Sequence, residues 1–338
     1  MSRALQRGEV ALDATGKGTA PVETLAPPNA DFFRRPLAPM LTALGVAVLV
    51  VLAISFARAN GLVAALWGAG GLAMAVWLRG GRGLQYDLGF GVLLLAGVFA
   101  GEILAGNGPS LSILFTLTNL LEIVLAVVLT RRVVTGLHVD SVQGLARFLA
   151  VCAIAPLPSA LIAAVALFNM ADQNFLDALR IWWSGHALGF AVIGVFGLSL
   201  RKTHLRMLKQ PARLAEAIGL GVLLASACYA IFSHMSLPYG FLLLPLIVLA
   251  AVRFRVIGAA WALLVVSVVA IGGTMAGHGP YHQFDPEDRA LLAQLLILLG
   301  YMPILMVAAL LEERDGLMQR AREGRLRAER AAAAKSRL

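Results

Sequence analysis

Glu122 is the residue whose type and position most clearly suggest chemistry. It lies within the apolar run 111–130, and Asn119 precedes it by three residues. Residues three apart share one face of a helix, and a carboxylate inside a bilayer costs about 3 kcal/mol or more unless it is paired or protonated. Two interpretations stay open: a functional intramembrane carboxylate, or a neutral Glu that joins helices by hydrogen bonds.

His186 is the second candidate, because histidine titrates near neutral pH. Counted from the outer ends of the runs, His186 lies about 8 Å deep and Glu122 about 16 Å deep, at about 1.5 Å per residue. Pairing between them then needs extended side chains or a bridging water. Glu102, about 3 Å deep by the same count, is an alternative partner. A backbone carbonyl is another.

Aromatic and proline residues mark two further features. Trp182 and Trp183 lie at the outer edge of the run 181–200, where indole rings either anchor the membrane interface or line a ligand pocket; Trp67 and Tyr86 are interpreted in the same way. Pro303 interrupts the last apolar run, so it predicts either a hinge above the C-terminal segment or a plain packing kink.

Enzymatic motifs do not emerge from this sequence. It contains no nucleophile–base pair, P-loop, GxGxxG after a strand or His-Glu-x-x-His. His278 and His282 lie near three acidic residues, but without the tight spacing typical of a metal site. We therefore predict no catalytic residue, no metal and no cofactor, and no enzyme activity for this chain alone.

Composition shows what solvent surrounds these residues. Of 338 residues, 59% are hydrophobic and 14% charged, and the mean hydropathy is +0.81. Soluble domains carry about 25% charged residues, so a lipid bilayer must be the main partner. The net charge of +9 would suit nucleic acid, but the basic residues form short clusters between apolar runs. No nucleic acid is expected.

Ten apolar runs approach the roughly 20 residues that a helix needs to cross a bilayer. The second and eighth runs are short, so each is expected to be a tilted, partial or re-entrant helix. The sequence therefore predicts an all-α integral membrane bundle of eight to ten transmembrane helices. The runs cover residues 37–57, 62–78, 84–104, 111–130, 145–168, 181–200, 214–232, 239–252, 256–275 and 290–311.

The basic clusters predict the orientation of the bundle. Cytoplasmic loops are enriched in Lys and Arg, and an alternating ten-span topology places all but three of the 28 on one side. Both termini are then cytoplasmic. The three exceptions are Arg58, Arg180 and Arg289.

Residues 312–338 differ from the rest of the chain. They are rich in Ala, Arg and Glu and contain no Pro, which predicts a helix reaching about 40 Å beyond the last span. A seven-residue frame containing Leu310, Leu317 and Ala321 suggests a homodimeric output helix. The alternative is a basic helix lying on anionic lipid.

Five stretches resemble the first membrane-associated sensor (MASE) domain family of bacteria. They match in order and spacing over about residues 37–314. They are Leu66-Trp67 with Gly70-Gly71; Asn119-Leu120-Leu121-Glu122; Trp182-Trp183-Ser184-Gly185-His186-Ala187-Leu188-Gly189; Leu244-Pro245 through Arg253-Phe254 and Gly258-Ala259 to Gly277-His278-Gly279-Pro280; and Ala309-Leu310-Leu311-Glu312-Glu313-Arg314.

The resemblance implies a sensory input module in the bacterial inner membrane, fused to a histidine kinase or a GGDEF diguanylate cyclase, in some members with a partner membrane protein. The sequence departs from the family at His186, where Asp is usual, and at Gly68 and Ala69, where prolines are usual. Residues 331–337 resemble the approach to a kinase phosphoacceptor helix. The output domain is therefore expected beyond the chain or on another polypeptide.

These observations divide the chain into a disordered cytoplasmic tail (1–36), a sensor domain (37–311) and a cytoplasmic output helix (312–338). Two other functions stay open. One is a small-solute transporter or permease, although no inverted repeat relates the two halves of the sequence. The other is a non-catalytic subunit that anchors another membrane protein.

Overall fold

A computed structural model describes residues 37–59, 65–207 and 209–335, so the predicted tail 1–36 lies outside the described residues. The described residues contain helices and no strand, which confirms the predicted all-α membrane bundle. Within the described part of the chain, eight helical segments are long and apolar enough to cross a membrane. The helices are α2 (Leu37–Ala59), α3 (Gly68–Arg79), α4 (Leu84–Leu104), α5 (Pro109–Val133), η1 (Thr135–Leu137), α6 (Val142–Ile154), α7 (Leu157–Ala171), α8 (Phe175–Ser199), α9 (Lys202–Met207), α10 (Pro211–His234), η2 (Tyr239–Leu243), α11 (Leu244–Met275), α12 (Pro286–Leu295), η3 (Leu296–Tyr301) and α13 (Pro303–Lys335).

The second predicted span is a short helix. α3 has 12 residues, about 18 Å of helix, whereas the hydrocarbon core of a bilayer is about 30 Å thick. The fifth predicted span also differs from a simple rod, because α6 and α7 meet at Pro156, which has no N–H to continue the helix.

The eighth and ninth predicted spans form a hairpin within α11. Arg255, at φ 59° and ψ −143°, breaks the helix. A Cβ atom on Gly258 would touch the backbone oxygen of Ala250, although residues eight apart in a continuous helix are about 12 Å apart. At the other end, Gly240 and Gly273 both lie against Phe232. The chain therefore reverses direction at Arg255.

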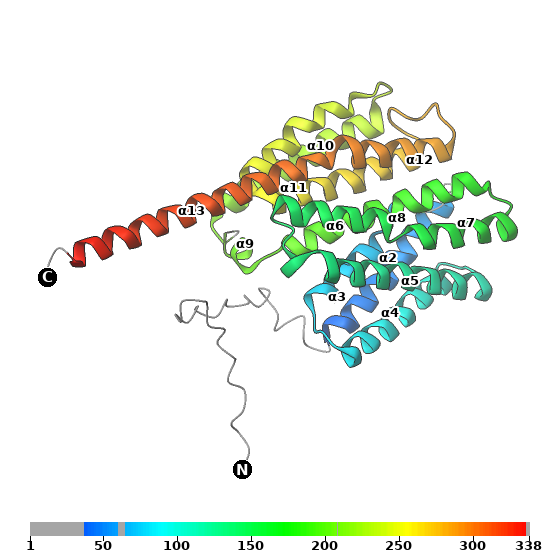
Figure 1. Ribbon diagram of the computed structural model, residues 1–338. Coiled ribbons are helices and arrows are strands. Elements are labelled where there is room, and N and C mark those ends of the chain that lie inside the picture. The colour runs from blue at the N-terminus through cyan, green and yellow to red at the C-terminus, as the bar shows by residue number, and fades with distance from the viewer. Residues whose placement is uncertain (1–36, 60–64, 208, 336–338) are drawn as a thin grey trace, which may run out of the picture.

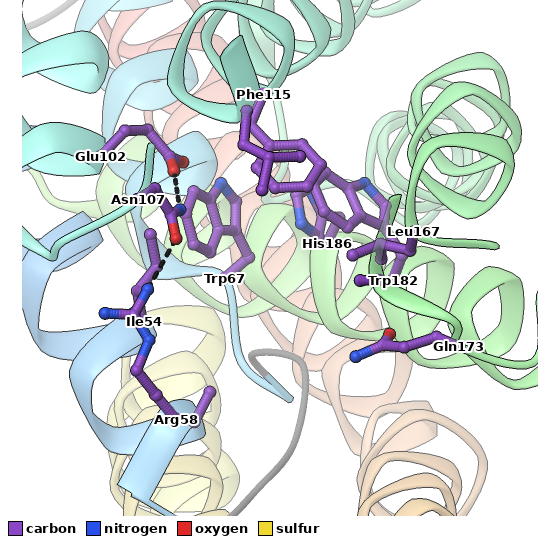
Figure 2. A pocket seen from close by; sticks show the side chains of 13 residues that line it. Ile54, Arg58, Trp67, Glu102, Asn107, Phe115, Leu167, Gln173, Trp182 and His186 are labelled. Atoms are coloured by element: carbon purple, nitrogen blue, oxygen red, sulfur yellow. Dashed lines mark hydrogen bonds between the residues drawn. The ribbon is translucent and has the colours of Figure 1, made fainter. Parts of the chain in front are cut away.

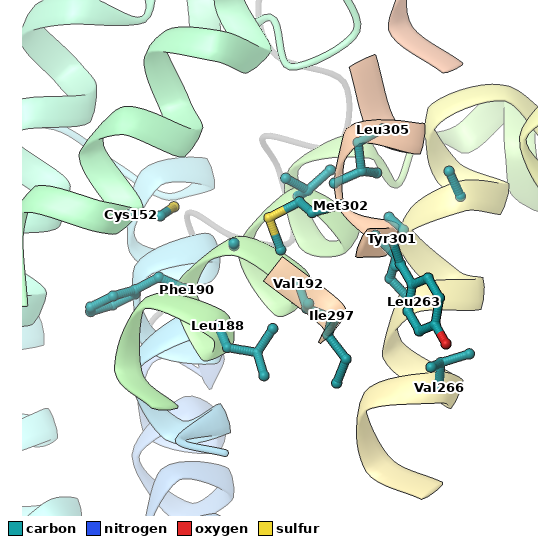
Figure 3. Packing of buried hydrophobic residues seen from close by; sticks show 14 of the residues in the cluster. Cys152, Leu188, Phe190, Val192, Leu263, Val266, Ile297, Tyr301, Met302 and Leu305 are labelled. Carbon is teal, nitrogen blue, oxygen red and sulfur yellow. The ribbon is translucent and has the colours of Figure 1, made fainter. Parts of the chain in front are cut away.

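α8 is the central helix of the bundle. Helices α3, α6, α7, α11 and α12 all contact it, and most of its residues are buried. Figure 3 shows part of the apolar core, where side chains from α6, α8, α11 and the start of α13 meet. A side chain on α8 can thus reach several helices at once.

One end of the bundle carries most of the charged contacts. Arg131 pairs with Asp87 at 2.8 Å, Arg201 with Asp140 at 2.5 Å, and Arg255 with Asp315 at 2.7 Å. Burial alone would raise the pKa of Asp140, but the charge and hydrogen bond of Arg201 outweigh it and hold that pKa below its ordinary 3.8. Asp140 therefore stabilises the fold above its unfolded pKa, and this contribution is lost as pH falls through the lower folded value.

α13 leaves the bundle at this charged end and continues as one helix to Lys335. Figure 1 shows it projecting well beyond the other helices. Leu305, Ala308 and Ala309 are buried in the core, whereas the described side chains from Leu317 onward are exposed.

Candidate functional site

A buried acid–histidine pair lies at the centre of the site. Glu122 of α5 and His186 of α8 are 0% and 2% exposed, and Glu122 Oε1 lies 2.6 Å from His186 Nδ1. This direct contact differs from the wide gap that counting depths along the sequence indicates. At this depth a paired charge costs far less than a single one, so each residue makes the burial of the other less costly.

Ser159 of α7 completes the polar cluster. Its hydroxyl contacts Glu122 Oε2 and also lies 2.9 Å from the carbonyl oxygen of Pro156. The hydroxyl has one proton, so it can donate a hydrogen bond to an ionised Glu122, or donate to Pro156 O and accept a hydrogen bond from a neutral Glu122. The geometry accommodates both states of the carboxyl group.

The order of contacts argues against a hydrolytic triad. In a Ser–His–acid triad the histidine lies between the other two groups and takes the serine proton. Here Glu122 lies between His186 and Ser159. This arrangement leaves Ser159 without the activation that a nucleophile needs.

Two indole rings enclose the imidazole of His186. The ring of Trp67 stacks on it at a centroid distance of 5.1 Å and an angle of 7°, and the ring of Trp182 stacks on it at 4.5 Å and 18°. Figure 2 shows the imidazole between the two indole rings. Stacked aromatic faces attract a neutral imidazole and also a cationic one. The sandwich fixes the orientation of the ring toward Glu122.

Glycines explain how Trp67 reaches His186. A Cβ atom on Gly71 would collide with the backbone of Gly189, and one on Gly189 would collide with the backbone of Trp67. The backbone N–H of Trp67 also donates to the backbone carbonyl of Gly185 at 3.2 Å. Without side chains at positions 71 and 189, α3 packs directly against α8.

A second buried polar link leads from α8 toward the C-terminal helix. Ser184, one half-turn before His186, donates to Gln294 Oε1 at 2.6 Å. The amide nitrogen of Gln294 donates to the carbonyl of Ala65 at 2.8 Å, just before Trp67. Gln294 therefore joins both aromatic-bearing segments to α12, which continues through η3 into α13.

A cavity of about 350 Å³ lies beside the stack, at the end of the bundle away from the projecting part of α13. Figure 2 shows Trp67, His186, Trp182 and Phe115 along one side of it. On another side, Arg58 donates to Asn107 Oδ1 at 2.6 Å, and Asn107 donates to Glu102 Oε2 at 2.5 Å. The cavity is thus lined by aromatic rings and by one polar chain.

The other predicted site residues lie near this cluster with different partners. Asn119 donates to Phe115 O of its own helix at 2.8 Å, and its buried Oδ1 has no hydrogen-bond partner among the described residues. Trp183 Nε1 donates to Ala153 O at 2.8 Å. Glu102 pairs with Asn107 rather than His186. Pro303 begins α13, directly after the π-helical segment η3.

Trp67 and Tyr86 occupy different environments, although the sequence suggests one role for both. Trp67 is buried in the stack, whereas Tyr86 is only partly buried, at the charged end against Gly80 and Gly81.

Ser159 and Gln294 are not among the residues that the sequence predicts for the site. Gln294 stands inside the last apolar run, where side-chain amides are rare, so a systematic search for amide side chains within the spans would have found it. Ser159 has no such signal, because serine is common in membrane helices and packs without a functional role.

No metal centre emerges among the described residues, since none of their His, Cys, Asp and Glu side chains form a cluster of three or more. His278 and His282 belong to the turn between α11 and α12, where His282 Nδ1 lies 2.9 Å from Gly279 O.

Comparison with known proteins identifies a family but no individual relative. The model of the MASE1 family matches residues 36–315, which is most of the chain. No curated protein matches the sequence, and no solved structure does.

Proposed function

Because the chain belongs to the MASE1 family of membrane-associated sensor domains, we propose that it is the sensory input of a signalling protein whose cytoplasmic output domain is driven by α13. The output domain is a histidine kinase or a diguanylate cyclase. The protein lies in the bacterial inner membrane with both termini in the cytoplasm, and it works as a homodimer through α13, with or without a partner membrane protein.

The single observation that carries this proposal is the buried link between the site and α13. Gln294 bonds Ser184 and Ala65, and only η3 and Met302 separate α12 from α13. A change in the packing of Trp67 or His186 thereby acts on the helix that leaves the membrane. A ligand shifts such a two-state bundle only by binding one state better than the other.

The segment η3 supplies a place where this change can be absorbed. Met302 N–H bonds Ile297 O, an i→i+5 contact typical of a π-helix, and Pro303 then lacks the N–H for a regular turn. Such interruptions bend helices at defined points. We infer that Pro303 is the hinge of the output helix.

The experiment fuses a histidine kinase domain after Leu338 and measures its autophosphorylation in membranes. Gln294→Leu keeps the size of the side chain and removes both hydrogen bonds. We therefore expect basal kinase activity to change at least about fivefold, which corresponds to a shift of about 1 kcal/mol in the free-energy difference between the two states of the bundle. Gln283→Leu, in the exposed turn before α12, is the matched control and is expected to leave the activity unchanged.

Glu122→Gln, His186→Ala and Pro303→Ala are measured in the same fusion and are also expected to alter kinase output while membrane insertion stays normal. If none of the four variants differs from the control, the signalling proposal is wrong. Solute uptake by the chain in liposomes, together with insensitive kinase fusions, would instead support a transporter.

A further inference from the structure

Arg58 is a charged residue in the wall of the cavity that forms no ion pair among the described residues. Its guanidinium donates to the backbone carbonyl of Ala105 and to the neutral amide oxygen of Asn107, the latter at 2.6 Å. We propose that this guanidinium binds the carboxylate of a small organic anion whose flat, apolar body lies in the cavity. The inference rests on the proposed sensory function, because it names the class of stimulus that the same site would recognise.

The guanidinium is held in position before any ligand binds. Arg58 stands near the end of α2, and both of its acceptors belong to the turn between α4 and α5. These two bonds use two of the five N–H groups of an arginine, so three remain for a ligand. A side chain that is already fixed loses little conformational freedom on binding. Arg58 is thus a preorganised site for an anion.

Arg58 is also the charged group of the cavity wall that a ligand can reach. It is exposed, whereas Glu102 and His186, which border the same cavity, are 1% and 2% exposed. Gln173 is half-buried in the wall and can add an N–H donor, but it carries no charge. The accessible polar surface of the cavity therefore favours a ligand with a negatively charged acceptor group.

Contact makes Arg58 outweigh Glu102. Asn107 joins the two side chains, since its amide oxygen accepts from Arg58 and its amide nitrogen donates to Glu102 at 2.5 Å. A carboxylate on the free N–H groups of Arg58 contacts that cation directly, whereas the covered carboxyl of Glu102 acts on it from a greater distance, and Coulomb energy falls with distance. A guanidinium also matches the planar geometry of a carboxylate and forms charge-assisted hydrogen bonds with it.

The rest of the wall favours a flat apolar body. The rings of Trp67, Trp182 and Phe115 border the cavity, and Figure 2 shows Phe115 and Trp182 on a different side of it from Arg58. The volume of about 350 Å³ leaves room for roughly two rings, because a cavity of about 150 Å³ accommodates benzene. Aromatic pairs gain energy beyond the area they bury. A ring system can thus lie against these side chains while its carboxylate meets Arg58.

The test compares three planar naphthalenes of nearly equal shape that differ in charge. They are 2-naphthoate (anion), 2-naphthamide (neutral) and 2-naphthamidine (cation). Binding is measured by equilibrium dialysis of the full chain in phosphatidylcholine nanodiscs, and empty nanodiscs are subtracted to remove partitioning into lipid. We expect saturable binding of naphthoate that is at least about tenfold tighter than that of naphthamide, with no saturable binding of naphthamidine. Laurate, a lipid-derived carboxylate without rings, should bind more weakly than naphthoate.

Variants locate the carboxylate at Arg58. Arg58→Gln removes the charge and should lower the naphthoate affinity at least about tenfold, to the level of naphthamide. Arg58→Lys keeps the charge and should retain part of the preference for the anion. Arg180→Gln is the matched control, because Arg180 already pairs with Asp177 at 3.7 Å and does not line the cavity. Ala171→Trp, at the exposed edge of the cavity, should weaken binding of naphthoate and naphthamide alike.

Glu102→Gln separates the roles of the two charged residues. The Gln side chain keeps an oxygen that can accept from Asn107 and removes the negative charge, so naphthoate binding should be unchanged or tighter. Loss of naphthoate binding in this variant would contradict the assignment of the ligand to Arg58.

Each outcome decides the proposal. Absence of saturable naphthoate binding, equal or tighter binding of naphthamide or naphthamidine, or tighter binding of laurate would overturn it. An equal loss of affinity in Arg58→Gln and Arg180→Gln would do the same, because it would show a general effect of net charge. Since dialysis uses no kinase, these results are independent of whether the fused output domain responds to Gln294→Leu.

Discussion

At the scale of single residues, the pairing of Glu122 with His186 controls the chemistry of the site. Each residue alone would be an expensive buried ionisable group, and the 2.6 Å contact makes them a unit. Ser159 and the two indole rings then fix the geometry of this unit. The pair therefore contributes to stability as a coupled element rather than as two independent side chains.

A double-mutant cycle measures this coupling. Glu122→Gln and His186→Gln are made singly and together, and the free energy of unfolding is measured in mixed micelles. We expect the loss of unfolding free energy in the double variant to be smaller than the sum of the two single losses by at least about 1 kcal/mol. The reason is that the first substitution already removes the contact.

Ser267→Ala, at a buried hydroxyl without a hydrogen-bond partner among the described residues, serves as the comparison for the cycle. Combined with Glu122→Gln, its effect should be additive. Additivity within about 0.3 kcal/mol for Glu122 and His186 would contradict a direct interaction.

Both members of the pair were predictable from the sequence, but their contact was not. The count of depths began at residues 111 and 181, where the hydropathy rises, whereas α5 begins at Pro109 and α8 at Phe175. Counted from the helix starts, Glu122 and His186 lie about 20 and 16 Å deep. The polar residues 175–180 at the start of α8 lie outside the predicted run, and they make up about half of the helix that precedes His186.

At the scale of helices, close backbone approach and a strained turn determine where the site lies. The small residues Gly70 and Gly71 allow tight packing, but their presence in the sequence does not identify α8 as the neighbouring helix. The hairpin in α11 is easier to predict, since Arg253 and Arg255 interrupt an apolar stretch of more than thirty residues. Sequence patterns thus locate breaks along the chain better than contacts across it.

Arg255 provides a test of the strained turn. Its φ of 59° with ψ of −143° is a backbone conformation suited to glycine. Arg255→Gly and Arg255→Ala both remove the ion pair with Asp315, so the two variants differ in backbone strain and in the unfolded-state entropy of glycine. We expect the Gly variant to be about 1 kcal/mol more stable than the Ala variant, since relief of strain exceeds the extra unfolded-state entropy of glycine.

The unfolding of these two variants is compared in the same detergent. Gly316, an open position on α13, supplies the control pair: there Gly316→Ala should stabilise, as expected for an unstrained helix. Equal stability of the Arg255→Ala and Arg255→Gly variants would show that the chain does not strain at this turn.

At the scale of the whole molecule, the charged contacts and the exit of α13 lie at the same end of the bundle. Composition and the spacing of basic residues were enough to predict a helical membrane protein of eight to ten passes. Which helices are neighbours depends on how their side chains fit together. The central place of α8 and the position of the cavity are therefore visible only in the structure.

The orientation of this end is predicted to be cytoplasmic, because all but three of the 28 Lys and Arg residues fall on that side of the ten-pass arrangement. Cys152 and Cys228 are both buried, so added cysteines can be labelled over a low background. Ser236→Cys and Gln283→Cys, exposed between helices at the opposite end, should react with a membrane-impermeant maleimide in intact cells. Gln210→Cys, exposed before α10, should react only after permeabilisation. The reverse pattern would place α13 outside the cytoplasm and remove the basis for an intracellular output domain.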